Sequence, residues 1–310
     1  MMVKKVGKVS MDYTYYPGED LYCDGEVENE ILDIVTNNSE EDYNRIINER
    51  KKWPILYHLS HVRENIIEWL PLTKNDKVLE IGAGCGAVTG ALARKAAEVT
   101  CIELSEKRSL INANRHRDCD NIKILLGNFE TIEPTLEEKY DYITLIGVLE
   151  YAGLYISDEK PFVRFLQVIS RHLKDDGKII VAIENRMGLK YLAGCQEDHV
   201  GLYFEGIEGY TQTSSAKTFS KTELIHIVED AGFKEYEFYY PYPDYKFPSV
   251  LYSDEWLPKV GELQNNSCSL DTERLLLFNE TLAYNELIKS GDFPYFSNSF
   301  LVELKKGQMG

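Results

Sequence analysis

The chain has 310 residues, of which 44% are hydrophobic and 12% aromatic, enough apolar material for the core of one α/β domain with insertions. Its formal net charge is −17, so the surface lacks the excess of Lys and Arg that phosphate backbones and anionic membranes require. We therefore expect no nucleic-acid partner and no insertion into a membrane, although the total charge does not test for a local basic groove.

The cysteines show neither a disulfide framework nor a metal-ligand spacing. No CxxC pair occurs, so we expect reduced thiols. The sequence shows no set of metal-ligating residues, and a metal requirement is not predicted. Residues 1–10 contain charges and no apolar run, unlike a signal peptide. No stretch approaches the roughly 20 apolar residues of a membrane-spanning helix, and we expect a soluble, cytoplasmic protein. The six cysteines are Cys23, Cys85, Cys101, Cys119, Cys195 and Cys268.

The N-terminal segment differs in composition from the rest of the chain. Residues 1–52 are acidic and rich in tyrosine, with Tyr13-Thr14-Tyr15-Tyr16 as one example. We expect an ordered arm or lid, and disorder is the alternative because aliphatic residues are few. One amphipathic helix is then predicted from Trp53 to Leu70, where Pro71 ends it.

Between Lys77 and Gly188, short apolar runs alternate with helical stretches. The runs are apolar on both faces, which is typical of parallel strands covered by helices on each side. This alternation predicts a doubly wound sheet. The predicted strands are Lys77–Ile81, Glu98–Leu104, Ile122–Leu126, Asp141–Ile146 and Lys178–Ile183. The predicted helices are Ala87–Ala97, Ser105–Arg117 and Glu159–Leu173, the last ending in a glycine turn at Lys174–Gly177.

The C-terminal third continues with further predicted elements and two insertions. Residues 185–218 and 241–296 are rich in Tyr, Phe and Gly. We expect these insertions, together with the arm, to cap the acceptor side of the domain; a packing extension or a dimer surface is the alternative. The oligomeric state is not predicted. The expected elements are a helix Phe219–Ala231 capped by Ser220 with Glu223 at N3, a strand Phe233–Tyr240, a helix Thr272–Ile288 and a strand Asn298–Leu304.

A glycine-rich loop follows the first central strand directly. It reads Gly82-Ala83-Gly84-Cys85-Gly86. Glycines at alternate positions let the backbone turn tightly and approach a ligand closely, and the helix that follows offers free N–H groups. A dinucleotide loop would read G-x-G-x-x-G, and here Ala87 occupies the position of the third glycine, so that pattern matches only in part.

Polar residues also stand at the ends of the next two strands. Glu103 ends the second strand, where a carboxylate can accept hydrogen bonds from both hydroxyls of a ribose, and a solvated strand end is the alternative. The third strand ends in Gly127-Asn128-Phe129-Glu130. Asn128 could hydrogen-bond an adenine edge while Phe129 packs on the ring, or Asn128 could form only an Asx turn.

These motifs resemble the class I S-adenosylmethionine-dependent methyltransferases. The resemblance rests on VLEIGAGCG, Glu103, GNFE, DYITLIGVLEYA and LKDDGKIIVAIEN in this order, and Asn128 departs from the Asp that many members carry. It implies an α/β, Rossmann-like fold: a mostly parallel sheet of seven strands in the order 3-2-1-4-5-7-6, with strand 7 antiparallel and helices on both faces. Together with the arm or lid expected from composition at residues 1–52, it gives an expected methyltransferase domain at residues 53–310.

The same resemblance implies S-adenosylmethionine as the cofactor. The three loop glycines would lie beneath its methionine and ribose portions, Glu80 near the methionine amino end, and Glu103 on the ribose hydroxyls. Arg63 could reach the methionine carboxylate. The expected cofactor-binding residues are Arg63, Glu80, Gly82, Ala83, Gly84, Gly86, Glu103, Leu104, Asn128 and Phe129.

Two downstream segments carry a narrower resemblance. Residues 183–194, IENRMGLKYLAG, and residues 241–248, PYPDYKFP, look like bacterial methyltransferases found beside or fused to glycosyltransferases of cell-surface polysaccharide assembly. The acceptor implied is a hydroxyl of a sugar or glycan, or a phosphate on a glycan.

No single residue stands out as the catalytic base. The sulfonium already activates the methyl group, so the enzyme mainly positions the acceptor, and a hydroxyl acceptor also has to lose a proton. Ligands bind at strand carboxyl ends in such sheets, which makes Glu150, Tyr151, Glu184, Arg186 and His199 the catalytic candidates. Arg186 could pair with a carboxylate or phosphate of the acceptor or form a structural ion pair. His58 and His61 are weaker candidates than His199.

The function that these residues predict is O-methylation of a small molecule or glycan, with S-adenosylmethionine as methyl donor. Two alternatives stay open from the sequence. One is a methyltransferase-like module that binds a partner without catalysis, and the other is an NAD-dependent oxidoreductase.

Overall fold

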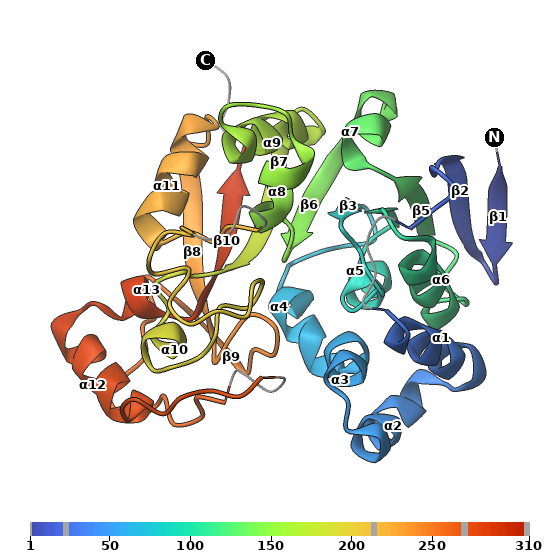
Figure 1. Cartoon of the computed structure of the whole chain (residues 1–310). Coiled ribbons are helices and arrows are strands. Elements are labelled where there is room, and N and C mark those ends of the chain that lie inside the picture. The colour runs from blue at the N-terminus through green and yellow to red at the C-terminus, as the bar shows by residue number, and fades with distance from the viewer. Residues whose placement is uncertain (1, 21–24, 212–215, 268–271, 307–310) are drawn as a thin grey trace. The chain divides into compact units, whose positions relative to one another are not determined.

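The computed structural model describes residues 2–20, 25–211, 216–267 and 272–306. The chain divides into two compact units, one of residues 1–144 and 172–177 and the other of residues 145–171 and 178–310. Strands β6 (Tyr140–Ile146) and β7 (Leu173–Glu184) both begin in the first unit and end in the second. Figure 1 labels the elements of both units. The predicted division into an arm at residues 1–52 and a domain at residues 53–310 stays a prediction.

The sheet of the first unit is built on three parallel strands. β3 (Lys77–Ile81) pairs with β4 (Glu98–Glu103), which pairs with β5 (Ile122–Gly127). On the outer side of β5, β2 (Val9–Tyr15) pairs in parallel, and β1 (Val3–Val6) pairs antiparallel to β2 (Figure 1). β3 has the beginning of β6 as its other neighbour. The N-terminal residues therefore extend the sheet.

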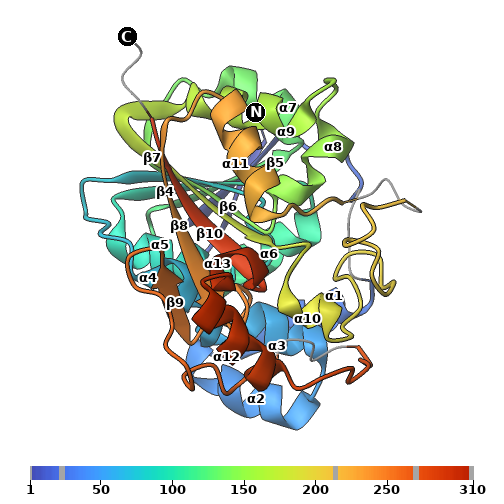
Figure 2. The same ribbon diagram turned by 90° about the vertical axis from the view of Figure 1, so that its left-hand side faces the viewer.

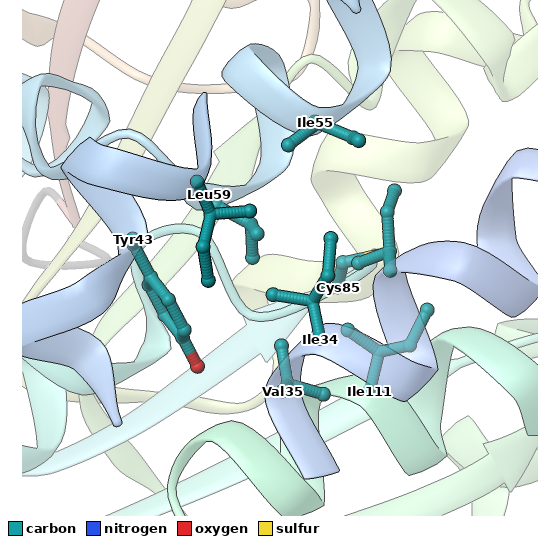
Figure 3. Close-up of a cluster of buried hydrophobic side chains, with 9 residues drawn as sticks. Ile34, Val35, Tyr43, Ile55, Leu59, Cys85 and Ile111 are labelled. Atoms are coloured by element: carbon teal, nitrogen blue, oxygen red, sulfur yellow. The ribbon is translucent and has the colours of Figure 1, made fainter. Parts of the chain in front are cut away.

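The helices of the first unit bring the N-terminal segment against the glycine loop. A buried apolar cluster joins Ile34 and Tyr43 to Leu59, to Cys85 of the loop and to Ile111 (Figure 3). Burial of such side chains contributes about 1.5–3 kcal/mol each, so this segment supports the loop. The helices are α1 (Val27–Asn37), η1 (Glu40–Asp42), α2 (Tyr43–Arg50), α3 (Trp53–Leu59), η2 (His61–Glu64), α4 (Asn65–Glu68), α5 (Thr89–Lys95), α6 (Glu106–Arg115), α7 (Phe129–Ile132) and η3 (Glu133–Thr135).

The second unit carries an antiparallel part of the sheet. β10 (Ser299–Lys305) lies antiparallel between β7 and β8 (Glu235–Tyr242), and β9 (Val250–Ser253) is antiparallel to β8. Helices α9 (Pro161–Ser170) and α11 (Lys221–Asp230) lie side by side (Figure 2). The remaining helices are η4 (Leu149–Tyr151), α8 (Ala152–Tyr155), α10 (Leu189–Leu192), α12 (Glu280–Ser290) and α13 (Phe293–Phe296).

The Rossmann-like, mostly parallel architecture agrees with the prediction, but the number of strands does not. The described residues form ten strands, not seven. The predicted order holds inside each unit, as β5-β4-β3 in the first and β7-β10-β8 in the second. The additional strands are β1, β2 and β9. In β2, buried Val9, Met11 and Tyr13 alternate with the more exposed Ser10, Asp12 and Thr14. This period of two is present in the sequence, but the acidic, tyrosine-rich composition of the whole segment led to the prediction of an arm.

Three predicted local structures are wrong. The helix predicted from Trp53 to Leu70 is broken at Ser60, whose backbone is extended and whose hydroxyl accepts a hydrogen bond from the Val62 N–H as the cap of a new turn. The turn predicted at residues 174–177 is part of β7. The ladder with β6 reaches back to His172, whose carbonyl accepts the Tyr140 N–H at 2.8 Å.

The helix predicted from Thr272 begins only at Glu280. Asn279 caps it by accepting the Leu282 N–H at 3.2 Å. The predicted cap of α11 is confirmed: the Ser220 hydroxyl accepts the Glu223 N–H, and the Glu223 carboxylate accepts the Ser220 N–H. Short polar side chains thus set both helix starts, and only the second was read correctly.

The described cysteines Cys85, Cys101, Cys119 and Cys195 are free thiols, whereas Cys23 and Cys268 lie outside the described residues. Within the described ranges, the helices are too short or too polar to cross a membrane.

Candidate functional site

The glycine loop at the end of β3 has the backbone that only glycine adopts easily. Gly82, Gly84 and Gly86 have φ values of 70°, 53° and 76°. A Cβ at Gly86 would lie 2.4 Å from Oδ1 of Asn112, whereas a Cβ at Gly84 would have no neighbouring atom within 4 Å. Gly86 is therefore required for packing against α6, and the space beside Gly84 is open.

Glu103 at the end of β4 faces this loop. Its Oε2 accepts the Gly84 N–H at 2.7 Å, and its Oε1 accepts the Ser105 N–H at 3.0 Å. The side chain is buried, and burial raises the pKa of its carboxyl group. The alternative of a solvated strand end is wrong, because neighbouring strand ends bring Glu103 and the loop together.

Asn128 and Phe129 begin α7 after β5. Oδ1 of Asn128 accepts the Glu130 N–H at 2.9 Å, so Asn128 is a helix cap, as in the Asx-turn alternative. Phe129 is buried. β2 reaches the same strand end: Tyr15 is the register partner of Gly127, and a Cβ at Gly127 would lie 2.6 Å from the Tyr15 carbonyl oxygen. Contact with adenine stays a prediction for Asn128 and Phe129.

Asp20 ties the N-terminal segment to the end of β4, which sequence reasoning missed. Its carboxylate accepts hydrogen bonds from the Ser105 hydroxyl at 2.8 Å and from the Glu106 N–H at 2.6 Å. These contacts cap α6 two residues after Glu103. The partners are 85 and 86 positions apart, a separation that leaves no local signal in the sequence.

Glu80 and Arg63 are both buried and engaged with protein neighbours. Oε2 of Glu80 accepts hydrogen bonds from the Thr89 hydroxyl at 2.7 Å and the Cys101 thiol at 3.4 Å. Burial raises the pKa of Glu80 to about 7. The Arg63 guanidinium lies 4.2 Å from the centre of the Tyr57 ring and donates to the Tyr57 hydroxyl. Their predicted contacts with the cofactor stay predictions.

The two remaining cofactor candidates flank the same strand ends. Ala83 is buried and donates its N–H to the Ile102 carbonyl at 3.3 Å, while Leu104 is half-buried after β4. Both positions place backbone beside the loop, and their contact with a cofactor is likewise a prediction.

In the second unit, four of the five catalytic candidates come together. Nε2 of His199 lies 3.6 Å from Oε1 of Glu150 and 3.9 Å from Oε2 of Glu184. The Tyr151 ring packs edge-on against the His199 ring, with centroids 5.5 Å apart. Glu150 lies in η4 after β6, Glu184 ends β7, and His199 follows α10, so the topology of the sheet creates the cluster.

Two lysines connect residues 183–194 with residues 241–248. Nζ of Lys246 lies 2.6 Å from Oε1 of Glu184, and Nζ of Lys190 lies 2.7 Å from Oδ2 of Asp244. Both ammonium groups also pair with Asp198. The sequence assigned no role to these charges, because the partners in the two segments are 54 and 62 positions apart.

The cluster shifts the protonation of its own members. Burial raises the pKa of Glu150. Burial has the same tendency at Glu184, but the positive charges of Lys246 and His199 outweigh it and lower the pKa. Burial opposes the charged form of His199, yet Glu184 and the other carboxylates around it raise the pKa of the imidazole well above its ordinary value.

Arg186 forms an ion pair with Glu223, as in the structural alternative considered from the sequence. Its Nε and Nη2 lie 2.7 and 2.9 Å from the two carboxylate oxygens of Glu223, and Nη1 donates to the Gly206 carbonyl. Among the weaker histidine candidates, His58 is buried and packs edge-on against Tyr57, and His61 is exposed. These contacts engage Arg186 and His58 with protein neighbours, and their catalytic roles stay predictions.

The central part of the chain has recognisable relatives. Residues 79–179 match a family model described as a methyltransferase domain. Ribosomal RNA small subunit methyltransferase A of Borrelia garinii subsp. bavariensis is 34% identical over 100 residues, which are 32% of this chain and 36% of that protein. Its counterpart in Streptococcus equi subsp. zooepidemicus is 36% identical over 66 residues, 21% of this chain and 23% of that protein. The chain thus spans about a third or less of the curated relatives it matches.

A solved structure shows the same fold over a longer stretch. A SAM-dependent methyltransferase from Archaeoglobus fulgidus aligns with a TM-score of 0.50 at 15% identity, covering 86% of this chain and 100% of that chain. At this identity the match shows likeness of fold.

Proposed function

We propose, on the premise that this chain carries an S-adenosylmethionine-dependent methyltransferase domain, that it transfers the methyl group to an oxygen of a small molecule or glycan. The observation that carries the proposal is the 2.7 Å contact between the buried Glu103 carboxylate and the Gly84 N–H. On this proposal Glu103 is the ribose-binding carboxylate, and support comes from its position beside a loop whose middle glycine would have no atom within 4 Å of an added Cβ.

The cofactor would lie along the ends of β3, β4 and β5. In this proposal Gly82, Gly84 and Gly86 pass beneath the methionine and ribose portions, and Glu103 accepts the ribose hydroxyls. Asn128 and Phe129 would frame the adenine. The anchoring of Asp20 at the start of α6 supports a lid role for residues 1–52, because it ties that segment to the end of β4.

For catalysis we retain Glu150, Tyr151, Glu184 and His199 and leave Arg186 out, because Glu223 already engages its guanidinium group. A hydroxyl acceptor loses a proton during methyl transfer. The closeness of two buried carboxylates and an imidazole supports this cluster as the place where that proton is taken up.

The glycan acceptor is supported by the resemblance of residues 183–194 and 241–248 to polysaccharide-associated methyltransferases. Both segments contribute to the charge network around Glu184 through Lys190, Asp244 and Lys246. We accordingly propose a role in polysaccharide biosynthesis, in the cytoplasm.

RNA is the competing acceptor, because the matched curated relatives act on ribosomal RNA by name. Their similarity covers a third or less of this chain. A net charge of −17 opposes RNA binding.

The test has two stages. Purified protein is first titrated with S-adenosylmethionine by calorimetry, and we expect micromolar binding. It is then incubated with methyl-labelled donor and three acceptor pools: oligosaccharides and sugar phosphates, small hydroxylated metabolites, and ribosomal RNA. Label in either of the first two pools supports the proposal. Label in RNA alone would replace it, and donor binding without transfer to any pool would favour a non-catalytic module.

A further inference from the structure

Three side chains of the second unit converge with the donor set of a metal site. One carboxylate oxygen each from Glu150 and Glu184 and one nitrogen of His199 all lie within 4.8 Å of one another. His199 Nε2 is 3.6 and 3.9 Å from the two oxygens. Ligands bound tetrahedrally at about 2.1 Å from one ion stand about 3.4 Å apart, so these separations need only small adjustments.

The two carboxylates have unused hydrogen-bonding capacity. Among the described residues, Oε2 of Glu150 and Oε2 of Glu184 have no hydrogen-bond partner, although each side chain is only 1% exposed. In Glu184 this is the oxygen that faces the His199 ring. Burying an unsatisfied carboxylate oxygen costs free energy. A cation beside His199 Nε2 would satisfy Oε2 of Glu184 directly. It would reach Oε2 of Glu150 by bidentate coordination, because Oε1 is the Glu150 oxygen that faces Nε2.

The imidazole is held from behind by a fixed carboxylate. Nδ1 of His199 lies 2.9 Å from Oε1 of Glu197. The Glu197 carboxylate is itself fixed by the N–H groups of His199 and Val200 and by the Tyr210 hydroxyl. If Nδ1 carries the proton, the lone pair of Nε2 points toward Glu150 and Glu184. Histidines that bind metals commonly donate their other ring N–H to a carboxylate in this way.

The charged groups around the three side chains carry an excess of negative charge that a divalent cation would reduce. Five carboxyl groups, those of Glu150, Glu184, Glu197, Asp198 and Asp244, stand against the ammonium groups of Lys190 and Lys246. With a neutral imidazole the excess is three negative charges, which a divalent ion would reduce to one. A protonated His199 would also reduce this excess, and the experiment has to separate the two.

We propose that Glu150, Glu184 and His199 bind a divalent transition-metal ion, with Glu197 positioning the imidazole. Two carboxylates and one imidazole suit Zn²⁺ or Mn²⁺ better than Ca²⁺, which prefers oxygen ligands alone. Three protein ligands leave a coordination position for an oxygen of a bound molecule. On the proposed methyltransferase function, that oxygen would be the acceptor hydroxyl, and the metal would lower its pKa. With Glu150, Glu184 and His199 occupied as ligands, the proton would pass to solvent water, and the methyl group would move from the donor sulfonium to the oxygen as S-adenosylhomocysteine leaves.

The test is direct metal binding by the full chain. Protein treated with a chelator and dialysed is titrated calorimetrically with zinc chloride and with manganese chloride, and one ion per chain is expected. Glu150→Gln, Glu184→Gln and His199→Asn should each weaken binding at least about 100-fold, and Glu197→Gln about 10- to 100-fold. His172→Asn is the matched control, because His172 forms a similar close pair with Glu133 in the first unit, and it should bind like the wild type.

A second measurement does not depend on variants that fold. X-ray absorption of the wild-type protein loaded with one equivalent of zinc should show one imidazole and oxygen ligands at about 2.0–2.2 Å. Absence of one-to-one binding, unchanged affinity in the four variants, or a spectrum without imidazole would each overturn the proposal. The cluster would then be an ion-pair network around a protonated His199. Titration with S-adenosylmethionine of the same metal-free protein tests the proposed function separately.

Discussion

Oε2 of Glu103 accepts the backbone N–H of Gly84 at 2.7 Å, across the ends of two neighbouring parallel strands. This contact joins the acidic residue after β4 to the glycine loop after β3. It makes the proposed cofactor site testable with single substitutions.

Changing Glu103 to Ala should weaken S-adenosylmethionine binding about 100-fold, because two hydrogen bonds from ribose hydroxyls to a charged acceptor are lost. Calorimetric titration measures the change. Glu98→Ala is the matched control, since Glu98 begins the same strand at its other end and is partly exposed. Equal affinities of wild type and Glu103→Ala would show that the site is assigned wrongly.

Two glycine substitutions in the loop should have different effects. Gly86→Ala should mainly lower the stability of the fold, and Gly84→Ala should mainly weaken cofactor binding. Gly86 has φ +76°, and a Cβ there meets Asn112, so we expect a loss of about 2–3 kcal/mol in the free energy of unfolding. Gly84→Ala adds a Cβ with no neighbour, so its stability loss should be nearer 1 kcal/mol, while its cofactor affinity falls. Urea unfolding and calorimetry measure the two effects. The reverse ranking in stability would contradict this assignment of roles.

Glu80 should make stability depend on pH. Burial raises its pKa to about 7 in the folded chain, from an ordinary value of 4.5. The native state therefore binds this proton more tightly than the unfolded state, so the contribution is full below pH 4.5 and is lost as pH rises through 7. Between pH 4.5 and 8 the wild type should lose on the order of 3 kcal/mol relative to Glu80→Gln. Urea unfolding of both proteins across this range tests it, and parallel pH curves would refute it.

The pair of Lys190 and Asp244 should contribute strongly to the integrity of the second unit. Nζ of Lys190 lies 2.7 Å from Oδ2 of Asp244, with both side chains buried. Lys190→Met leaves a buried carboxylate without its counter-charge, which costs about 3–5 kcal/mol. Lys289→Met, at an exposed pair with Glu286, is the control and should change stability by less than about 1 kcal/mol. Similar unfolding midpoints for the two variants would contradict the argument.

Much of the central fold could be predicted because its signals are local. The run Lys77–Ile81 is a strand with the predicted bounds, and Ser220 with Glu223 forms the predicted cap. The residues that signal a buried strand or a helix cap lie within a few consecutive positions of the chain. The N-terminal strand β2 carries a local alternation of buried and more exposed residues that was overlooked. Its place beside β5, more than a hundred positions away, has no local signal.

By itself the sequence determined the glycine loop, the Glu103 position after the next strand and the order of the elements between them. Backbone conformation and strand ends follow from neighbouring residues, and parallel strands bring their carboxyl ends to one edge. Only the tertiary structure decided that Glu150, Glu184 and His199 meet, that Lys246 pairs with Glu184, and that Arg186 is held by Glu223. Those contacts join residues 15 to 62 positions apart, and they exist only because the folded sheet and its loops bring distant segments into register.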